Sequence, residues 1–112
     1  MLRIDVEDID TGLQVLRLFG TLDGLTFMDL NKAMNNSVET GVDRIVLDME
    51  EVDYTTSAGL RVILMGAKAL KEKEGELVLF GMNSAVKEVF KLSGFDTMFK
   101  TFASEEEALA SF

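Results

Sequence analysis

Hydrophobic and polar positions along the chain follow two different spacings. Short apolar runs, typical of β-strands, alternate with longer segments in which apolar residues recur every three or four positions, as they do on one face of a helix. The predicted strands cover residues 4–7, 13–19, 45–49, 76–81 and 98–102. Helices are predicted from Thr26 to a stop at Gly41, from about Ser57 to Lys73, and over residues 84–93 and 104–109.

The order of these segments predicts an α/β fold. After the first two strands, strands alternate with helices, which indicates βαβ units with right-handed crossovers and a largely parallel sheet. The first two strands are joined by a turn around Asp10, Thr11 and Gly12 and are expected to pair antiparallel. We therefore expect one domain over residues 1–112, a mixed, mostly parallel sheet of four or five strands flanked by about four helices.

Three helix starts carry capping signals. Thr26 with Asp29 is a weaker form of the capping box, and Ser104 with Glu107 is a full one. Ser57 falls at the predicted N-cap of the second helix.

Composition excludes several classes of function. The chain has 20 acidic and 11 basic residues and a net charge of -9, so its field repels nucleic-acid phosphates, and no nucleic-acid partner is expected. With no His and no Cys it cannot form a Ser-His-Asp triad, a thiol nucleophile or the usual zinc site. No carboxylate loop of the calcium-binding kind is present, so we expect a non-enzyme without metal or cofactor.

No apolar run reaches the roughly 18 residues of a membrane span, and no signal peptide is recognisable, which predicts a cytoplasmic protein without membrane insertion.

The segment from Val46 to Leu60 places small hydroxyl residues between a buried strand and a helix. A helix start presents free backbone N–H groups and partial positive charge, so Ser57 suits an anionic group such as a phosphate. The structural alternative is that Ser57 only caps the helix. It is not a hydrolase nucleophile, because Thr55 stands where the nucleophile elbow needs glycine and no histidine is available as base.

The helix after Ser57 has two apolar stripes when projected at about 100° per residue. The first is the expected core face: Leu60, Ile63, Leu64, Ala67 and Leu70. The second lies nearly opposite, flanked by Arg61 and Lys68, and consists of Ala58, Val62, Met65 and Ala69. This second stripe is either a docking surface or is covered by another part of the chain.

Three segments resemble the STAS domain family: residues 20–23, residues 46–60 with their Thr-Ser-Ala-Gly-Leu, and residues 83–95. The resemblance implies the STAS fold without a cofactor. In the bacterial anti-sigma factor antagonists of this family, the serine that matches Ser57 is phosphorylated by the anti-sigma factor, itself a serine kinase, and is restored by a serine phosphatase. The unphosphorylated antagonist binds the anti-sigma factor and frees a sigma factor. The family often has Asp where this chain has Thr56, which puts kinase recognition in question and makes Thr55 and Thr56 secondary candidates.

The expected function is therefore a phosphorylation-regulated binding switch with Ser57 as the phosphoacceptor. The expected partner surface consists of Asp23, Asp53, Thr55, Thr56, Ala58, Gly59, Arg61, Val62, Met65 and Ala69. A STAS subunit of a larger assembly, such as a lipid-transport complex or a stress-sensing scaffold, is the alternative in which Ser57 only caps. A phosphotransfer enzyme or nucleotide binder is a third, against which the absence of phosphate-binding glycine motifs argues.

Overall fold

The computed structural model describes residues 1–112, and its sheet has five strands that lie in the same order in space as in the sequence. β1 (Leu2–Asp10) pairs antiparallel with β2 (Leu13–Leu22) through a tight turn at Gly12, whose φ is 76°. β3 (Arg44–Thr55), β4 (Glu76–Phe80) and β5 (Lys100–Phe102) then add in parallel. The predicted antiparallel start and parallel remainder are both confirmed.

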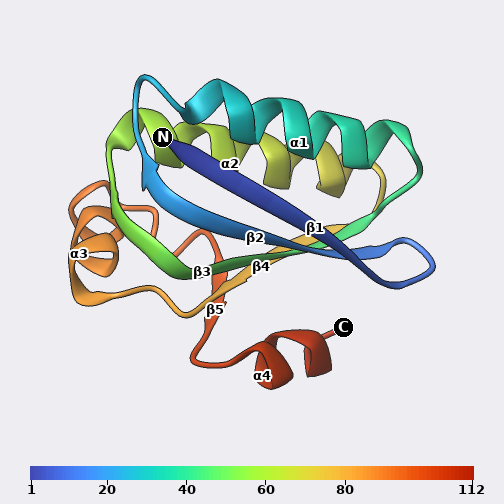
Figure 1. Cartoon of the computed structure of the whole chain (residues 1–112). Helices are drawn as coiled ribbons and strands as arrows, with labels where there is room; N and C mark the ends of the chain where they lie inside the picture. Colours follow the sequence, from blue (N-terminus) through green and yellow to red (C-terminus); the bar gives the residue numbers. More distant parts are fainter.

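Four helices flank this sheet, as Figure 1 shows. α1 (Phe27–Glu39) and α2 (Ser57–Glu72) lie side by side across one face. α3 (Ser84–Leu92) packs where β3 ends, and the short α4 (Glu105–Ala110) lies on the opposite face. No helix combines the length and the apolar character that crossing a bilayer requires.

Alternation along the strands divides the core into two layers. The larger cluster fills the space under α1, α2 and α3 and includes Leu16, Leu47 and Leu79. The smaller one lies under α4 and consists of Leu13, Val15, Val46, Val78, Phe80 and Ala108. β3 is buried on both faces from Ile45 to Met49, as its continuous apolar run predicts for a central strand.

Strand β3 is longer than the sequence pattern predicts, since it continues past Met49 to Thr55. Acidic residues at positions 50, 51 and 53 are typical of a loop. Val52 and Thr55 are nevertheless buried, and the backbone of this stretch stays paired with β2. Two register shifts in the β2–β3 ladder accommodate this irregular stretch. The last predicted strand is shorter than expected and covers only residues 100–102.

At two helix starts the structure differs from the capping predictions. Thr26 is the N-cap residue of α1 as predicted, but its side chain makes no capping bond, because its hydroxyl donates to the Thr21 carbonyl over 2.7 Å. Ser57 is the first residue of α2 rather than its N-cap, because the Thr56 hydroxyl accepts the Gly59 N–H at 3.4 Å. Ser104 caps α4 as predicted, by accepting the Glu107 N–H at 3.2 Å.

Candidate functional site

The candidate site lies where the carboxyl ends of β2 and β3 meet the first turn of α2. The Leu22 carbonyl accepts the Thr56 N–H at 3.0 Å, which fixes the start of the helix against the end of β2. The Thr21 hydroxyl donates to the Asp53 carboxylate at 2.7 Å and links the same two strands side by side. Parallel strands end at one edge of a sheet, so the topology itself collects these residues.

Gly59 permits the close approach of α2 to β2. A Cβ atom at this position would stand 2.7 Å from the Leu22 Cγ, 2.7 Å from the Leu22 carbonyl oxygen and 2.8 Å from the Thr55 Oγ1. Those distances are too short for any side chain, so only glycine fits unless the helix moves. Gly59 therefore sets the position of the Ser57 turn on the sheet.

Ser57 is the one hydroxyl of the Thr55-Thr56-Ser57 run that is free. Its side chain is exposed and makes no hydrogen bond within the chain. Thr55 is 0% exposed and donates its hydroxyl to the Thr56 carbonyl at 3.2 Å, while the Thr56 Oγ1 is engaged as the helix cap. The prediction that Ser57 stands free at the surface is thus confirmed, although it occupies the position after the cap.

Exposed apolar side chains lie on the segments that meet at the start of α2. Leu25, in the β2–α1 loop, is 93% exposed, and Tyr54, near the end of β3, is 49% exposed. Ala58 and Met65 are also exposed, and with Arg61 they form one ridge along α2, because residues three, four and seven apart share a helix face. We call the exposed residues of this region the Ser57 surface: Leu25, Tyr54, Ser57, Ala58, Arg61 and Met65.

Three residues predicted to contact a partner are buried instead. Val62 is 3% exposed and belongs to the larger core cluster, because α1 packs beside α2 and widens the buried face of that helix. Thr55 and Gly59 are buried by the contact between α2 and the end of β2. The second apolar stripe of α2 is therefore partly covered by the chain itself, with Ala69 half-buried and only Ala58 and Met65 exposed.

The two predicted acidic partner residues have local roles in the structure. The Asp23 carboxylate accepts the N–H groups of Leu25 and Thr26 at 2.8 and 3.1 Å and so shapes the loop that carries Leu25. The Leu25 N–H above all, and then the Thr26 N–H, hold the pKa of Asp23 below its usual value. Asp53 accepts the Thr21 hydroxyl described above, so each carboxylate already has a donor from its own chain.

Asn83 joins the site to α3, a role that the sequence pattern did not reveal. Its side-chain amide donates to the carbonyls of Val52 and Asp53 at 3.1 and 3.2 Å, while its carbonyl oxygen caps α3 by accepting the Val86 N–H at 2.8 Å. Leu25 and Tyr54 were also missed. The signal for Leu25 was a lone leucine inside a turn rich in Gly and Asp.

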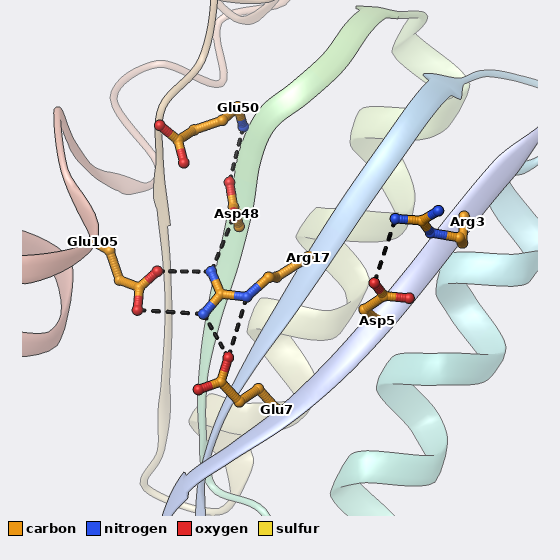
Figure 2. Close-up of polar contacts among 7 residues, drawn as sticks. All are labelled: Arg3, Asp5, Glu7, Arg17, Asp48, Glu50 and Glu105. Carbon is orange, nitrogen blue, oxygen red and sulfur yellow. Dashed lines mark hydrogen bonds and ion pairs between the residues drawn. The ribbon is translucent and has the colours of Figure 1, made fainter.

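A second polar cluster lies on the other side of the sheet. Figure 2 shows Arg17 between Glu7, Asp48 and Glu105, with contacts of 2.7, 3.1 and 2.7 Å. These carboxylates, Glu105 first and Glu7 next, raise the pKa of Arg17 further above its usual range. Because Glu105 is the first residue of α4, the cluster ties this helix to the sheet. No group of acidic side chains in the chain is arranged to hold a metal ion.

The family model described as the STAS domain matches residues 4–108. This chain belongs to the STAS domain family.

Named relatives place the chain among the anti-sigma factor antagonists of that family. BtrV of Bordetella bronchiseptica, described as an anti-sigma factor antagonist, is 38% identical over 111 residues, which cover 99% of this chain and 95% of BtrV. The crystal structure of an anti-sigma factor antagonist from Mycobacterium paratuberculosis has a TM-score of 0.89 at 25% identity and covers 99% of this chain and 93% of that one.

The fold is also that of SpoIIAA from Bacillus. Its unphosphorylated form has a TM-score of 0.84 at 24% identity, covering 97% of this chain and 95% of SpoIIAA. Its phosphorylated form has a TM-score of 0.75. The predicted STAS fold is confirmed.

Proposed function

We propose that this STAS domain is a phosphorylation-regulated anti-sigma factor antagonist. The unphosphorylated chain binds an anti-sigma factor that is also a serine kinase and thereby frees a sigma factor. Phosphorylation of Ser57 ends the binding, and a serine phosphatase restores it. The observation that carries the proposal is the exposed, unbonded Ser57 hydroxyl within the Ser57 surface.

The phosphoryl transfer needs only a nucleophile from this chain. The Ser57 Oγ forms a bond to the γ-phosphorus of ATP, the bond from that phosphorus to the β–γ bridging oxygen breaks, and ADP leaves. The hydroxyl proton passes to a base of the kinase, since this chain has no histidine and Ser57 has no hydrogen-bonded base of its own.

Site selection within the hydroxyl run follows from burial. The Thr55 hydroxyl is enclosed and the Thr56 hydroxyl is the helix cap, so phosphorylation at either would require α2 to detach from β2. Ser57 can enter a kinase active site with the fold intact. Ser57 is therefore the acceptor even though Thr56 replaces the aspartate that is frequent in the family.

Loss of binding after phosphorylation follows from charge. A phosphoserine adds about -1.5 to -2 charges at pH 7 to a surface whose side chains are largely apolar. Covering that surface with a partner would require the phosphate to lose water, and the net charge of -9 on the chain adds no compensation. The phosphorylated chain is therefore expected to leave its partner.

The acceptor assignment is tested with ATP and the anti-sigma factor kinases of the source organism, each purified and mixed with this chain. Mass spectrometry is expected to find one phosphate on Ser57 in the wild type and none in Ser57→Ala. Ser84→Ala is the matched control, because Ser84 is also exposed and is also the first residue of a helix, directly after the N-cap Asn83. Phosphate on Thr55, Thr56 or Ser84 would contradict the proposal.

The binding switch is tested by titrating the same kinase with each variant. Ser57→Ala and Ser84→Ala are expected to bind like the wild type, and Ser57→Asp at least about tenfold more weakly, which corresponds to about 1.4 kcal/mol. If Ser57→Asp and the phosphorylated wild type both bound the kinase as tightly as the unmodified chain does, the switch would be refuted. That result would favour instead a STAS subunit of a larger assembly, in which Ser57 carries no regulatory phosphate.

A further inference from the structure

We propose that Arg61 binds the phosphate of phosphorylated Ser57 and holds it on the surface of α2. This inference rests on the proposed function, because it concerns the phosphorylated form of the same serine. It assigns Arg61 as a positioning residue of the switch.

Arg61 differs from every other arginine of the chain in having no partner. The chain has four arginines. Arg3 pairs with Asp5, Arg17 with three carboxylates, and Arg44 with Asp43. Arg61 is exposed and makes neither an ion pair nor a side-chain hydrogen bond, in a chain where 20 acidic residues face 11 basic ones. The Arg61 guanidinium is therefore available to bind an anion that is added to the chain by modification.

The spacing places this guanidinium beside the acceptor hydroxyl. Ser57 and Arg61 are four residues apart in α2, so they are neighbours on the helix surface with Cβ atoms about 5–6 Å apart. The arginine side chain is long enough to span that distance. Its planar guanidinium donates two parallel N–H bonds to phosphate oxygens, which an ammonium group does not.

No carboxylate of the chain forms an ion pair with Arg61. The first turn of α2 contains no acidic residue. Two acids at the site also accept hydrogen bonds from other donors, Asp23 from loop amides and Asp53 from the Thr21 hydroxyl. A phosphate on Ser57, four residues before Arg61 in the same helix, would thus give this guanidinium an anionic partner that it lacks in the unmodified chain.

Such a pair gives the phosphate a second effect on the Ser57 surface. Before phosphorylation the Arg61 charge is available to an acidic group of the partner. Afterwards the guanidinium is occupied, and the charge of the Ser57–Arg61 pair has changed from +1 to roughly -0.5 to -1. The modification therefore adds a repulsive group and removes an attractive one at the same time.

The test uses chain made with phosphoserine incorporated at position 57 during translation, so that no kinase is needed. The second pKa of the phosphate is followed by 31P NMR in wild-type, Arg61→Gln, Arg61→Lys and Lys68→Gln backgrounds. Arg61→Gln is expected to raise that pKa by about 0.15 to 0.4, because the doubly charged phosphate loses its cation. Arg61→Lys should restore part of the difference, and Lys68→Gln, which removes an exposed cation two turns further along α2, should leave the pKa near the wild-type value.

An unchanged phosphate pKa in Arg61→Gln would overturn the inference, and so would an equal shift in Lys68→Gln, which would indicate a general field instead of a specific pair. The result is independent of whether any kinase modifies Ser57. If no kinase does so, the proposed function fails although the Arg61 pair is measured. If Ser57 is a kinase substrate and the phosphate pKa is insensitive to Arg61, only the present inference fails.

Discussion

Substituting Gly59 by alanine tests whether the close contact between α2 and β2 positions the site. The added Cβ would meet the Leu22 carbonyl oxygen and Leu22 Cγ at 2.7 Å and the Thr55 Oγ1 at 2.8 Å. Relieving the two shortest contacts to about 3.4 Å requires a movement of ~0.7 Å. Leu22 and Thr55 are fully buried and one contact is to backbone, so the helix rather than a side chain has to move.

The magnitude is the difference of two opposing effects. Overpacking of a tight site costs about 1–3 kcal/mol, and a clash with backbone belongs in the upper half of that range. Alanine gains up to about 1 kcal/mol over glycine inside a helix. We therefore expect Gly59→Ala to lower the free energy of unfolding by about 1–2 kcal/mol, which corresponds to a fall in Tm of roughly 4–8 °C for a domain of this size.

Gly66→Ala in the same helix is the matched control for this measurement. It gains the same helix propensity, but the short contacts of its Cβ would be to the thioether end of Met34, at 2.7 Å from the Sδ and 2.9 Å from the Cε, with Leu77 Cδ1 at an ordinary 3.9 Å. A methionine terminus moves aside at low cost, so this variant should melt within about 2 °C of the wild type or above it. Thermal melts followed by far-UV circular dichroism decide the comparison. Equal Tm values for the two variants, or a Gly59→Ala protein as stable as the wild type, would refute the reasoning.

Three further predictions concern stability and pH. Thr56→Ala should lower the free energy of unfolding, measured in urea, by about 0.5–1 kcal/mol, at the low end for a cap because this hydrogen bond is long. Thr56→Asp keeps a hydrogen-bond acceptor at the N-cap and should be at least as stable as the wild type. Equal stability of the two variants would contradict the capping role of Thr56. Arg17→Met should lower the free energy of unfolding by about 1–3 kcal/mol, because it leaves the nearly buried Asp48 without its cation. Arg3→Met removes an exposed ion pair and should lower it by less than about 0.5 kcal/mol. The reverse order would rule out a stabilising role for the Arg17 cluster. Hydrogen bonds lower the pKa of Asp23, so its ionised form stabilises the loop at pH values above the ordinary pKa. This stabilisation is lost as the pH falls through the lowered pKa. An Asp23 carboxyl whose pKa by 13C NMR is 3.8 or higher would contradict the loop geometry.

The fold was predictable because its strongest signals are local. The apolar run at residues 45–49 is too short for a helix and too apolar for a surface strand, so it could only be a central strand. The end of β3 was not predictable in the same way. Glu50, Glu51 and Asp53 are typical of a loop, and they are tolerated in the strand because they are exposed while Val52 and Thr55 are buried.

The site was only partly predictable because its accessibility depends on tertiary contacts. Ser57 and Thr56 are both good capping residues, and sequence alone did not show that the backbone contact between Thr56 and Leu22 makes Thr56 the cap. The burial of Val62 depends on where α1 lies, which the periodicity of α2 does not contain. The exposure of Leu25 likewise follows from a loop held by the Asp23 carboxylate.

The separation of the Ser57 surface from the packed core limits how the phosphate that we propose for Ser57 could act. The Ser57 hydroxyl bonds to nothing in its own chain, so a phosphate there breaks no internal contact. The Arg17 cluster that ties α4 to the sheet lies on the other face. A phosphate at Ser57 would therefore leave the fold unchanged and would act through surface charge, unlike modifications that order or melt a segment. In 1H–15N NMR spectra, phosphoserine at position 57 should shift amide signals of residues 22–26 and 53–61 and leave those of β4 and α4 in place. Changes that reach α4 would show that the phosphate acts through a conformational change, and the charge argument would then be wrong.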